Sequence, residues 1–408
     1  MTTSPQSLLD ATNPDPHAAA MRLTLIRDAD VHAPESLGVQ QLLLGDGKIL
    51  WIGDHLPALP EALAVDVVEL EGRRLIPGLI DGHVHVTGGG GEAGFSTRVP
   101  APMLSRYTRA GVTSVVGLLG TDDVARSTRE LVASIHALRE QGLNAWGYSG
   151  GYHLPPTTLT GSVRGDIVFI DALLGVGEVA ISDHRSSQPT LDELLRLASE
   201  AHVAGLMTGK AGIVHLHLGD GPRGLALVRQ ALDQSELPAR VFNPTHVNRR
   251  KALFEEAVEL AHRGCSIDIT AFPVEEGEDA WSAADAWLRY RDSGAPPERV
   301  TISSDAGGCL PCFDADGQVC SMDVGESGAL LATLNALLAR GATLAQALPA
   351  FTRNPATLLR LAGKGRIAPG FDADLVALDA GGAASDVWIN GVTHVRAGAL
   401  QRRGIFED

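Results

Sequence analysis

A short apolar stretch, residues 75–86, ends in two histidines and constrains the fold more than any other segment of this chain. His83 and His85 lie two positions apart, and on a β-strand that spacing places both side chains on one face. Two imidazoles that converge from a strand end suit a divalent metal such as zinc. Two separate histidines in a polar turn would give the same short pattern. The apolar strand before the pair and the glycines at 88–91 after it favour the metal site.

The composition bounds the class of protein. The chain has 408 residues, of which 44% are hydrophobic and 20% charged, as is typical of a globular protein of one or two domains. A net charge of −16 argues against a nucleic acid or an anionic membrane as partner. Residues 1–20 are polar and contain prolines, which predicts a disordered leader and not a signal peptide. With four cysteines and no apolar run of roughly 20 residues, we expect a cytoplasmic protein without a membrane partner.

The two ends of the chain share a β-rich texture. Residues 21–75 contain short runs of strand-forming residues separated by turns, and residues 363–408 repeat this pattern. We therefore predict one small β-sandwich domain built from both chain ends.

The central region, residues 76–362, alternates strands with helices. Besides the stretch that carries the histidine pair, the expected strands are residues 112–116, 144–148, 179–182, 213–218, 241–246, 266–270 and 300–305. The expected helices include residues 190–203, 223–234, 251–263 and 326–340. Eight strands over this length predict an α/β fold, a (β/α)8 TIM barrel. A doubly wound sheet is the alternative, but it would not gather side chains from so many strands.

In such a barrel, reactive residues gather at the carboxyl ends of the strands. Besides His83 and His85, the candidates at strand ends are Glu178, His217, His246 and Asp305. Any one of these histidines alone is more typical of a core position. Four histidines and two carboxylates at one face can together hold two metal ions and a bridging hydroxide.

A bound metal lowers the pKa of water from 15.7 to about 7, which provides a nucleophile at neutral pH. We expect Asp305 to hold a metal, take the proton of the hydroxide and pass it to a leaving amine. His215 faces the same side of its strand as His217 and is the rival ligand. We favour His217 because it is nearer the strand end.

Several longer stretches resemble a known family. They are PGLIDGHVH at 77–85, GGGGEAG at 88–94, GVTSVVGLLGTD at 111–122, ISDHRS at 181–186, THVNR at 245–249 and VTISSD at 300–305. These motifs resemble the amidohydrolase superfamily of metal-dependent hydrolases and, within it, the isoaspartyl dipeptidases. The likeness covers nearly the whole chain after residue 20.

The resemblance implies a dipeptidase that cleaves β-aspartyl dipeptides with two divalent metal ions, zinc being favoured, and that forms a homo-oligomer larger than a dimer. It implies that Glu92 binds the α-ammonium of the substrate and that the Gly90 backbone and Thr121 hold its aspartyl part. It further implies that Arg185 and Arg249 bind the carboxylates and that Tyr152 stabilises the oxyanion. Such a dipeptide carries one ammonium and two carboxylates, which matches one anion and two guanidinium groups.

Three alternatives stand beside this prediction. The two arginines could form ordinary ion pairs at the barrel end. The enzyme could be a hydantoinase-like or N-acyl-amino-acid hydrolase, although charged groups in the site would be wasted on an uncharged substrate. A non-catalytic barrel is a further alternative, but it would be expected to have lost more of the ligand residues.

The chain departs from the family pattern at the fourth strand. The family bridges its metals with a carboxylated lysine there, and this chain has no lysine between Lys48 and Lys210. Glu178 follows Gly177 at nearly the same place, with one apparent extra residue. Because a glutamate has the shorter stem, the strand must bulge inward for Glu178 to bridge two metals. A single-metal site is the alternative.

A second departure concerns Cys309, which stands where the family motif has a serine near the substrate. A thiol is the weaker hydrogen-bond donor, so the reaction class is better predicted than the details of the substrate.

Overall fold

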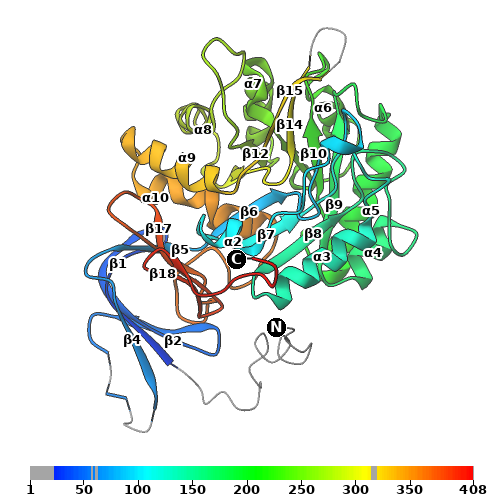
Figure 1. Ribbon diagram of the computed structural model, residues 1–408. Coiled ribbons are helices and arrows are strands. Elements are labelled where there is room, and N and C mark those ends of the chain that lie inside the picture. Colours follow the sequence, from blue (N-terminus) through cyan, green and yellow to red (C-terminus); the bar gives the residue numbers. More distant parts are fainter. Residues whose placement is uncertain (1–22, 57, 60–62, 314–318, 408) are drawn as a thin grey trace.

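The computed structural model describes residues 23–56, 58–59, 63–313 and 319–407, with the side chains of 311–313 left out (Figure 1). The leader predicted at residues 1–20 lies outside this described part. Within the described residues, no helix combines the length and the apolar character that crossing a membrane requires.

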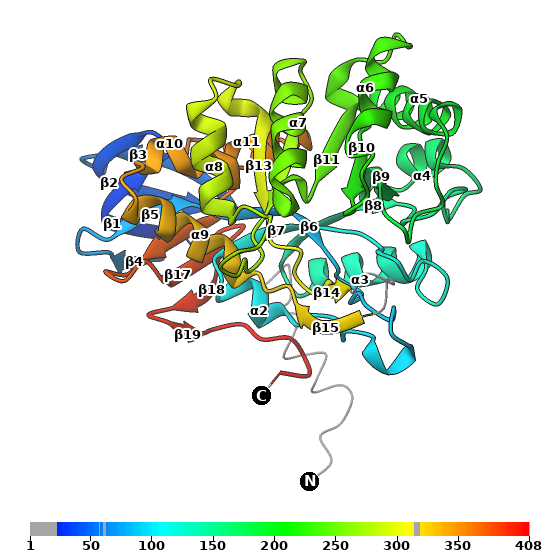
Figure 2. The same ribbon diagram turned by 90° about the horizontal axis from the view of Figure 1, so that it is seen from above.

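Eight parallel strands form the centre of the molecule. They are β6 (Leu79–Val84), β7 (Val112–Gly117), β8 (Asn144–Ser149), β9 (Leu173–Ile181), β10 (Val214–Leu218), β11 (Phe242–Thr245), β12 (Ile267–Thr270) and β13 (Val300–Ser303). Strands β6 to β11 pair in chain order as one parallel sheet, and β12 pairs with β13. Strand β11 packs beside β12 and β13 beside β6, so the sheet curls into the predicted (β/α)8 barrel (Figures 1 and 2).

The closure between the last and first strands sits next to the predicted site. A parallel bridge joins Val84 to Ala306. Beside it, the Ser304 backbone N–H donates to Asp81 Oδ1 at 3.1 Å, and the Ser304 hydroxyl donates to the other carboxylate oxygen. These contacts hold the residues after β13 against the strand that carries the histidine pair.

Helices cover the outside of the curled sheet (Figure 2). They are α2 (Leu104–Thr108), α3 (Thr128–Glu140), α4 (Val163–Phe169), α5 (Leu191–Thr208), α6 (Ala226–Asp233), α7 (Lys251–His262), α8 (Ala283–Asp292), α9 (Gly328–Ala339), α10 (Leu344–Ala347) and α11 (Arg353–Leu358). Five 3-10 turns join them: η1 (Phe95–Thr97), η2 (Ala239–Val241), η3 (Val247–Arg249), η4 (Pro297–Arg299) and η5 (Leu348–Phe351).

Helix α5 shows how the sequence sets such an element. Thr190 caps its first turn in a capping box with Glu193, which satisfies N–H groups that the helix leaves open. Gly209 ends it in the left-handed conformation, with φ of 76°. The side chains buried between these ends recur at helical spacing and face the barrel: Leu194, Leu197, Ala198, Ala201 and Ala204.

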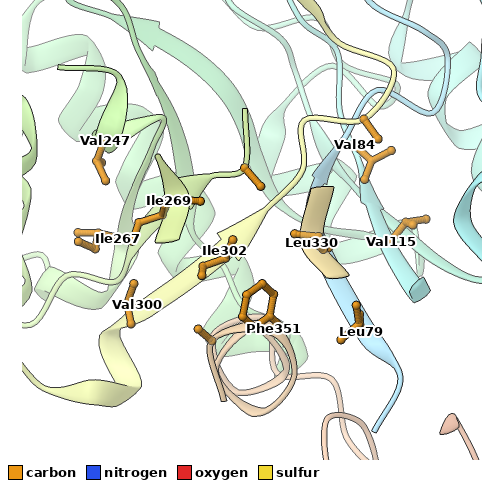
Figure 3. Close-up of a cluster of buried hydrophobic side chains, with 14 of the residues drawn as sticks. Leu79, Val84, Val115, Val247, Ile267, Ile269, Val300, Ile302, Leu330 and Phe351 are labelled. Carbon is orange, nitrogen blue, oxygen red and sulfur yellow. The ribbon is translucent and has the colours of Figure 1, made fainter. Parts of the chain in front are cut away.

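Branched side chains fill the space between the strands and the helices (Figure 3). Ile267 and Ile269 of β12, Ile302 of β13 and Phe351 of η5 are at most 1% exposed. Burying side chains of this size stabilises the fold by about 1.5–3 kcal/mol each, relative to exposure. The rigid core holds the strand ends in place, and the side chains of the site extend from them.

The two chain ends meet in one further sheet of nine strands. It contains β1 (Leu23–His32), β2 (Ser36–Gly45), β3 (Lys48–Gly53), β4 (Val65–Glu69), β5 (Arg74–Pro77), β16 (Leu375–Leu378), β17 (Ala384–Ile389), β18 (Val392–Arg396) and β19 (Ala399–Leu400). Strand β5 pairs with β16, which joins the N-terminal and C-terminal parts. We propose this sheet as the small domain, and its boundaries at 21–75 and 363–408 stay a prediction. A separate hairpin, β14 (Cys309–Phe313) and β15 (Val319–Val324), follows the barrel's last strand.

Candidate metal centre and substrate cavity

The six predicted metal ligands lie together at the carboxyl ends of the barrel strands. All are buried, with at most 7% exposure. Their ligand atoms form three overlapping groups, each within 4.8 Å: His83, His85 and Glu178; His83, His246 and Asp305; and Glu178, His217 and His246. Five strands contribute to this cluster, and only a closed barrel brings five strand ends to one point.

Glu178 lies at the centre of the cluster and faces both sides of it. Its Oε1 is 3.5 Å from Nε2 of His85. Its Oε2 is 3.0 Å from Nδ1 of His217 and 3.4 Å from Nε2 of His246. Its Oε2 also lies 3.6 Å from Nε2 of His83, so the carboxylate contacts members of all three groups, an arrangement that fits a bridge between two metal ions.

A bulge in β9 brings Glu178 to this position. Val176 pairs with Val214 of β10, and Val179 pairs with Leu216. Two residues of β9, Gly177 and Glu178, therefore oppose a single residue of β10. The strand has the extra residue that the sequence predicted, and bulges of this kind re-aim side chains next to active sites.

Two of the ligand candidates lie where the chain turns sharply after a strand. His246 and Asp305 have φ of 57° and 55°, in the left-handed region that residues with a Cβ adopt rarely. Conformations of this kind cluster at functional sites. They turn both side chains back over the strand ends.

The donor atoms fit a divalent metal. His83 Nε2 and Asp305 Oδ1 are buried and have no hydrogen-bond partner within the described part of the chain. Asp305 Oδ1 lies 3.1 Å from His85 Nε2 and 3.4 Å from His83 Nε2. Buried polar atoms without a partner are costly, and a metal ion among imidazole and carboxylate ligands would satisfy them.

Three of the four resolved pKa shifts among these candidates favour a metal, and the fourth opposes it. Burial alone would raise the pKa of Glu178 and Asp305, but the neighbouring histidines hold both pKa values well below the ordinary range. Burial lowers the pKa of His246 to about 3, which keeps this imidazole neutral. For His83, burial opposes but the charges of Glu178 and Asp305 prevail, raising its pKa to about 9. Metal binding at His83 therefore competes with a proton.

His215, the rival ligand, lies outside these groups within the described residues. Its Nε2 is 2.8 Å from Nδ1 of His83, on the side away from Glu178 and Asp305. Burial lowers the pKa of His215 to about 3, so it is neutral. The structure thus brings His217 into the cluster and places His215 behind His83.

A cavity of about 370 Å³ opens over the cluster. Every residue that the resemblance assigned to the substrate lines it: Gly90, Glu92, Thr121, Tyr152, Arg185, Arg249 and Cys309. The metal-ligand candidates His85, Glu178, His217, His246 and Asp305 form part of the same wall. Placement alone does not assign roles, and the roles of these residues stay predictions.

Glu92 lines this cavity, and one of its carboxylate oxygens has no hydrogen-bond partner among the described residues. Thr121 Oγ1 and Arg185 Nη1 donate to its Oε1 at 3.0 and 3.3 Å. Its Oε2 is buried and has no hydrogen-bond partner among the described residues. A cationic group of a ligand would satisfy this oxygen.

Two neutral donors, Tyr152 and Cys309, also line the cavity. The hydroxyl of Tyr152 is 2.8 Å from Nδ1 of His217, and burial raises the pKa of this phenol well above 10. Burial also raises the pKa of the Cys309 thiol to about 11. Both groups therefore keep their protons at neutral pH.

Sequence reasoning missed Asp183. Its carboxylate accepts from Arg185 Nε at 3.1 Å and Nη2 at 2.8 Å, and it lies 3.1 Å from Nε2 of His217. Asp183 therefore joins a substrate-binding candidate to a metal-ligand candidate. Its position two residues before Arg185, inside the ISDHRS motif, was the available signal.

Comparison with known proteins agrees with this geometry. Residues 74–394 match the model of the Amidohydrolase family. The chain therefore belongs to the amidohydrolase family, and it is a hydrolase.

Within that family the chain groups with the beta-aspartyl dipeptidases. Two crystal structures of beta-aspartyl dipeptidase from the thermophilic keratin degrader Fervidobacterium islandicum AW-1 are similar to it. The one in complex with the beta-Asp-Leu dipeptide is 40% identical, with a TM-score of 0.89, covering 94% of this chain and 99% of that chain. The other is 39% identical, with a TM-score of 0.85 over 93% and 99%. The likeness to isoaspartyl dipeptidases predicted from the motifs is confirmed.

More distant relatives share less. An imidazolonepropionase from Ruegeria sp. (strain TM1040) is 26% identical and covers 86% of this chain and 90% of its own length. A dihydropyrimidinase from Brevibacillus agri NCHU1002 is 16% identical over 94% of this chain and 97% of its own, with a TM-score of 0.67, which shows a shared fold alone.

Proposed function

We propose that this chain hydrolyses β-aspartyl dipeptides with two divalent metal ions, zinc being the metal we favour. The observation that carries the proposal is the cavity, in which one carboxylate, of Glu92, and two guanidinium groups lie beside the cluster of metal-ligand candidates. The proposed ligands are His83, His85, Glu178, His217, His246 and Asp305. We propose Glu178 as the bridging ligand, in place of a carboxylated lysine, which would make the centre independent of carbon dioxide.

The charges of the cavity suit the charges of the substrate. Glu92 would bind the α-ammonium through its open Oε2. Arg185 and Arg249 would share the two substrate carboxylates with their present partners, Asp183 for Arg185 and Asp220 for Arg249. A guanidinium group whose N–H donors on one edge already bond a protein carboxylate can bind a substrate carboxylate through the donors on its other edge. An uncharged cyclic amide, the substrate of the hydantoinase-like alternative, would use none of these charges.

The reaction assigns a task to each remaining group. When bound, the metal ions would polarise the scissile carbonyl and supply a nucleophile by lowering the pKa of water. Asp305, whose carboxylate is charged, would accept a proton from the nucleophile and deliver it to the leaving amine. The protonated Tyr152 would donate a hydrogen bond to the developing oxyanion. The Gly90 backbone, Thr121 and the Cys309 thiol would contact the aspartyl part.

The test is steady-state hydrolysis of β-Asp-Leu beside α-Asp-Leu, with wild type, Glu178→Ala and Glu259→Ala. Glu259 is an exposed residue of α7 and serves as the control. We expect cleavage of the β isomer alone, two metal equivalents in wild type and the control, and loss of both metal and activity in Glu178→Ala. Activity should persist in buffer freed of carbon dioxide.

Two results would contradict the proposal. Failure of the wild type to cleave β-Asp-Leu while two metals are bound would remove the substrate assignment. One metal equivalent in a fully active wild type would remove the bridging role of Glu178 and leave a single-metal enzyme.

Two expectations from the family resemblance are also proposals. We propose a homo-oligomer larger than a dimer, to be tested by light scattering on the purified protein. We propose a cytoplasmic location, which cell fractionation would test.

A further inference from the structure

We infer that His215, held by Asn243, is a positioning residue that fixes His83 in the tautomer whose Nε2 is open to a metal. The inference rests on the proposed metal site, and it assigns to His215 a task different from that of a ligand. It concerns a chain of three hydrogen bonds that begins at a backbone carbonyl and ends at the metal-ligand cluster.

The direction of the chain is set at its far end. Asn243 Nδ2 lies 2.8 Å from the carbonyl oxygen of Ser266. A carbonyl oxygen can only accept, so the amide nitrogen of Asn243 must face it. The amide oxygen Oδ1 of Asn243 then faces His215, 2.7 Å from its Nδ1.

Each later bond follows from the one before. Because Asn243 Oδ1 accepts, Nδ1 of His215 carries the proton, and Nε2 of a neutral His215 carries a lone pair. Nδ1 of His83 lies 2.8 Å from this Nε2 and must therefore donate its proton to it. The remaining nitrogen, Nε2 of His83, faces Asp305 Oδ1 at 3.4 Å and can offer its lone pair to a metal.

Tight packing keeps the rings of His83 and His215 from rotating and so preserves these hydrogen bonds. His83, His215 and Asn243 are each at most 1% exposed. The ring of Tyr148 stacks on His215, with centroids 5.0 Å apart and planes 16° from parallel. Buried polar side chains keep the hydrogen-bond partners that the fold gives them.

His246, another ligand candidate, shows what the series of hydrogen bonds behind His83 contributes. Nδ1 of His246 lies 2.8 Å from the hydroxyl of Thr270. A hydroxyl can donate or accept, so Thr270 alone does not set the tautomer of His246. The series of hydrogen bonds behind His83 ends on a backbone carbonyl, so a single tautomer of His83 satisfies all of them. Outer partners of metal-binding histidines typically change metal affinity 10–100-fold when they are altered.

The test compares two amides at position 215. In His215→Gln, the amide oxygen can reach the place of Nε2 and accept from His83. In His215→Asn, the shorter side chain reaches only the place of Nδ1, next to Asn243, and leaves His83 without its acceptor. Zinc stoichiometry and affinity are measured by competition with a chelator, and the visible spectrum of the cobalt-loaded protein reports the ligand geometry.

We expect His215→Asn to bind zinc about 10–100-fold more weakly than wild type, with an altered cobalt spectrum. We expect His215→Gln to restore zinc affinity to within about threefold of wild type, since the hydrogen bond to His83 is kept. The control is the same pair of substitutions at His394, a buried histidine of β18 whose ring nitrogens have no hydrogen-bond partner within the described chain. The His394 variants should bind zinc as wild type does.

A further variant covers the case in which a position 215 variant does not fold. Asn243→Leu is close in size to the native side chain but removes the acceptor of His215, and it should weaken zinc binding about tenfold or more. Equal zinc affinity in wild type and in either His215→Asn or Asn243→Leu would overturn the inference. Equal weakening in His215→Asn and His215→Gln would overturn it as well, because packing and not hydrogen bonding would then be the cause.

Zinc affinity is measured without substrate. A protein that shows this pattern and yet does not cleave β-Asp-Leu would contradict the proposed function and leave the inference standing. Cleavage of β-Asp-Leu together with unchanged zinc affinity in His215→Asn would do the reverse.

Discussion

Gly177 of β9 lies directly against His215 of β10. A Cβ built on Gly177 would lie 2.7 Å from Cβ of His215 and 2.8 Å from its carbonyl oxygen, closer than real Cβ atoms approach. The glycine therefore lets the two strands meet at the bulge that carries Glu178.

This close approach predicts that Gly177→Ala separates the strands and moves Glu178 away from the histidines. Overpacking of this kind costs about 1–3 kcal/mol, so the free energy of unfolding should fall by that amount in denaturant titration. Metal content should fall with it. Gly328→Ala in α9, where a Cβ meets nothing within 4 Å, is the control and should lower neither, because Ala is up to about 1 kcal/mol more favourable than Gly in a helix. Full metal occupancy in Gly177→Ala would show that the bulge does not depend on the glycine.

Asp183 contacts both Arg185, a substrate-binding candidate, and His217, a metal-ligand candidate. Burial alone would raise its pKa, but His217 and Arg185 hold it well below its ordinary range, so the carboxylate is charged. Asp183→Asn replaces an acceptor oxygen with an N–H group that faces N–H donors. We expect zinc affinity to fall about 10–100-fold, as for other outer partners of ligand histidines, and KM to rise. Asp192→Asn, at an exposed position of α5, should leave both unchanged. A change in kcat alone would contradict the coupling.

The open oxygen of Glu92 predicts how the substrate ammonium contributes. Removing one charge-assisted hydrogen bond costs about 1.5–3 kcal/mol, so Glu92→Gln should lower kcat/KM for β-Asp-Leu about 10–150-fold. The matched substrate is N-acetyl-β-Asp-Leu, which lacks the ammonium and should be cleaved equally poorly by both proteins. An equal loss on both substrates would mean that Glu92 acts through the fold.

The strand ends of the barrel could be predicted because topology, not local contact, brings them together. Any chain with eight βα units gathers its strand ends at one face, so the ligand candidates followed from their positions in the sequence. Local boundaries were less accurate. Strand β9 begins at Leu173, six residues before the predicted start, because Gly175 and Gly177 interrupt its apolar pattern and lower its strand propensity.

Contacts between elements could not be predicted in the same way. His215 and His217 point to the same face of one strand, and the pattern cannot distinguish a ligand from the partner of a ligand. The difference depends on which neighbouring strand each ring meets. Asp183 lies in a loop after β9, where no periodicity indicates the direction of a side chain.

The raised pKa of Cys309 predicts a slow thiol. A pKa of about 11 keeps it protonated at neutral pH, so alkylation by iodoacetamide should be slow at pH 7, rise about tenfold for each pH unit, and level off only above about pH 11. Cys265, which is buried and whose pKa burial raises to about 12, provides an internal comparison and should react last. Mass spectrometry of the labelled peptides measures both rates.

Because Cys309 is a neutral donor, Cys309→Ser should keep kcat/KM for β-Asp-Leu within about tenfold. Rapid alkylation of Cys309 at pH 7 would contradict the protonated thiol.

The outer wall of the substrate cavity predicts a preference at the leaving residue. Four exposed carboxylates line this wall beside Phe272 and Leu310: Asp220, Glu275, Glu278 and Asp323. Like charges repel, so β-Asp-Glu should be cleaved several-fold less efficiently than β-Asp-Lys at low ionic strength. Salt screens exposed charges, with a Debye length of about 3 Å at 1 M, so the difference should shrink at high salt.

The rate with β-Asp-Leu serves as the control and should change little. Glu278→Gln combined with Asp323→Asn should reduce the difference. Equal kcat/KM for the two charged substrates at low salt would mean that the leaving residue does not meet this wall.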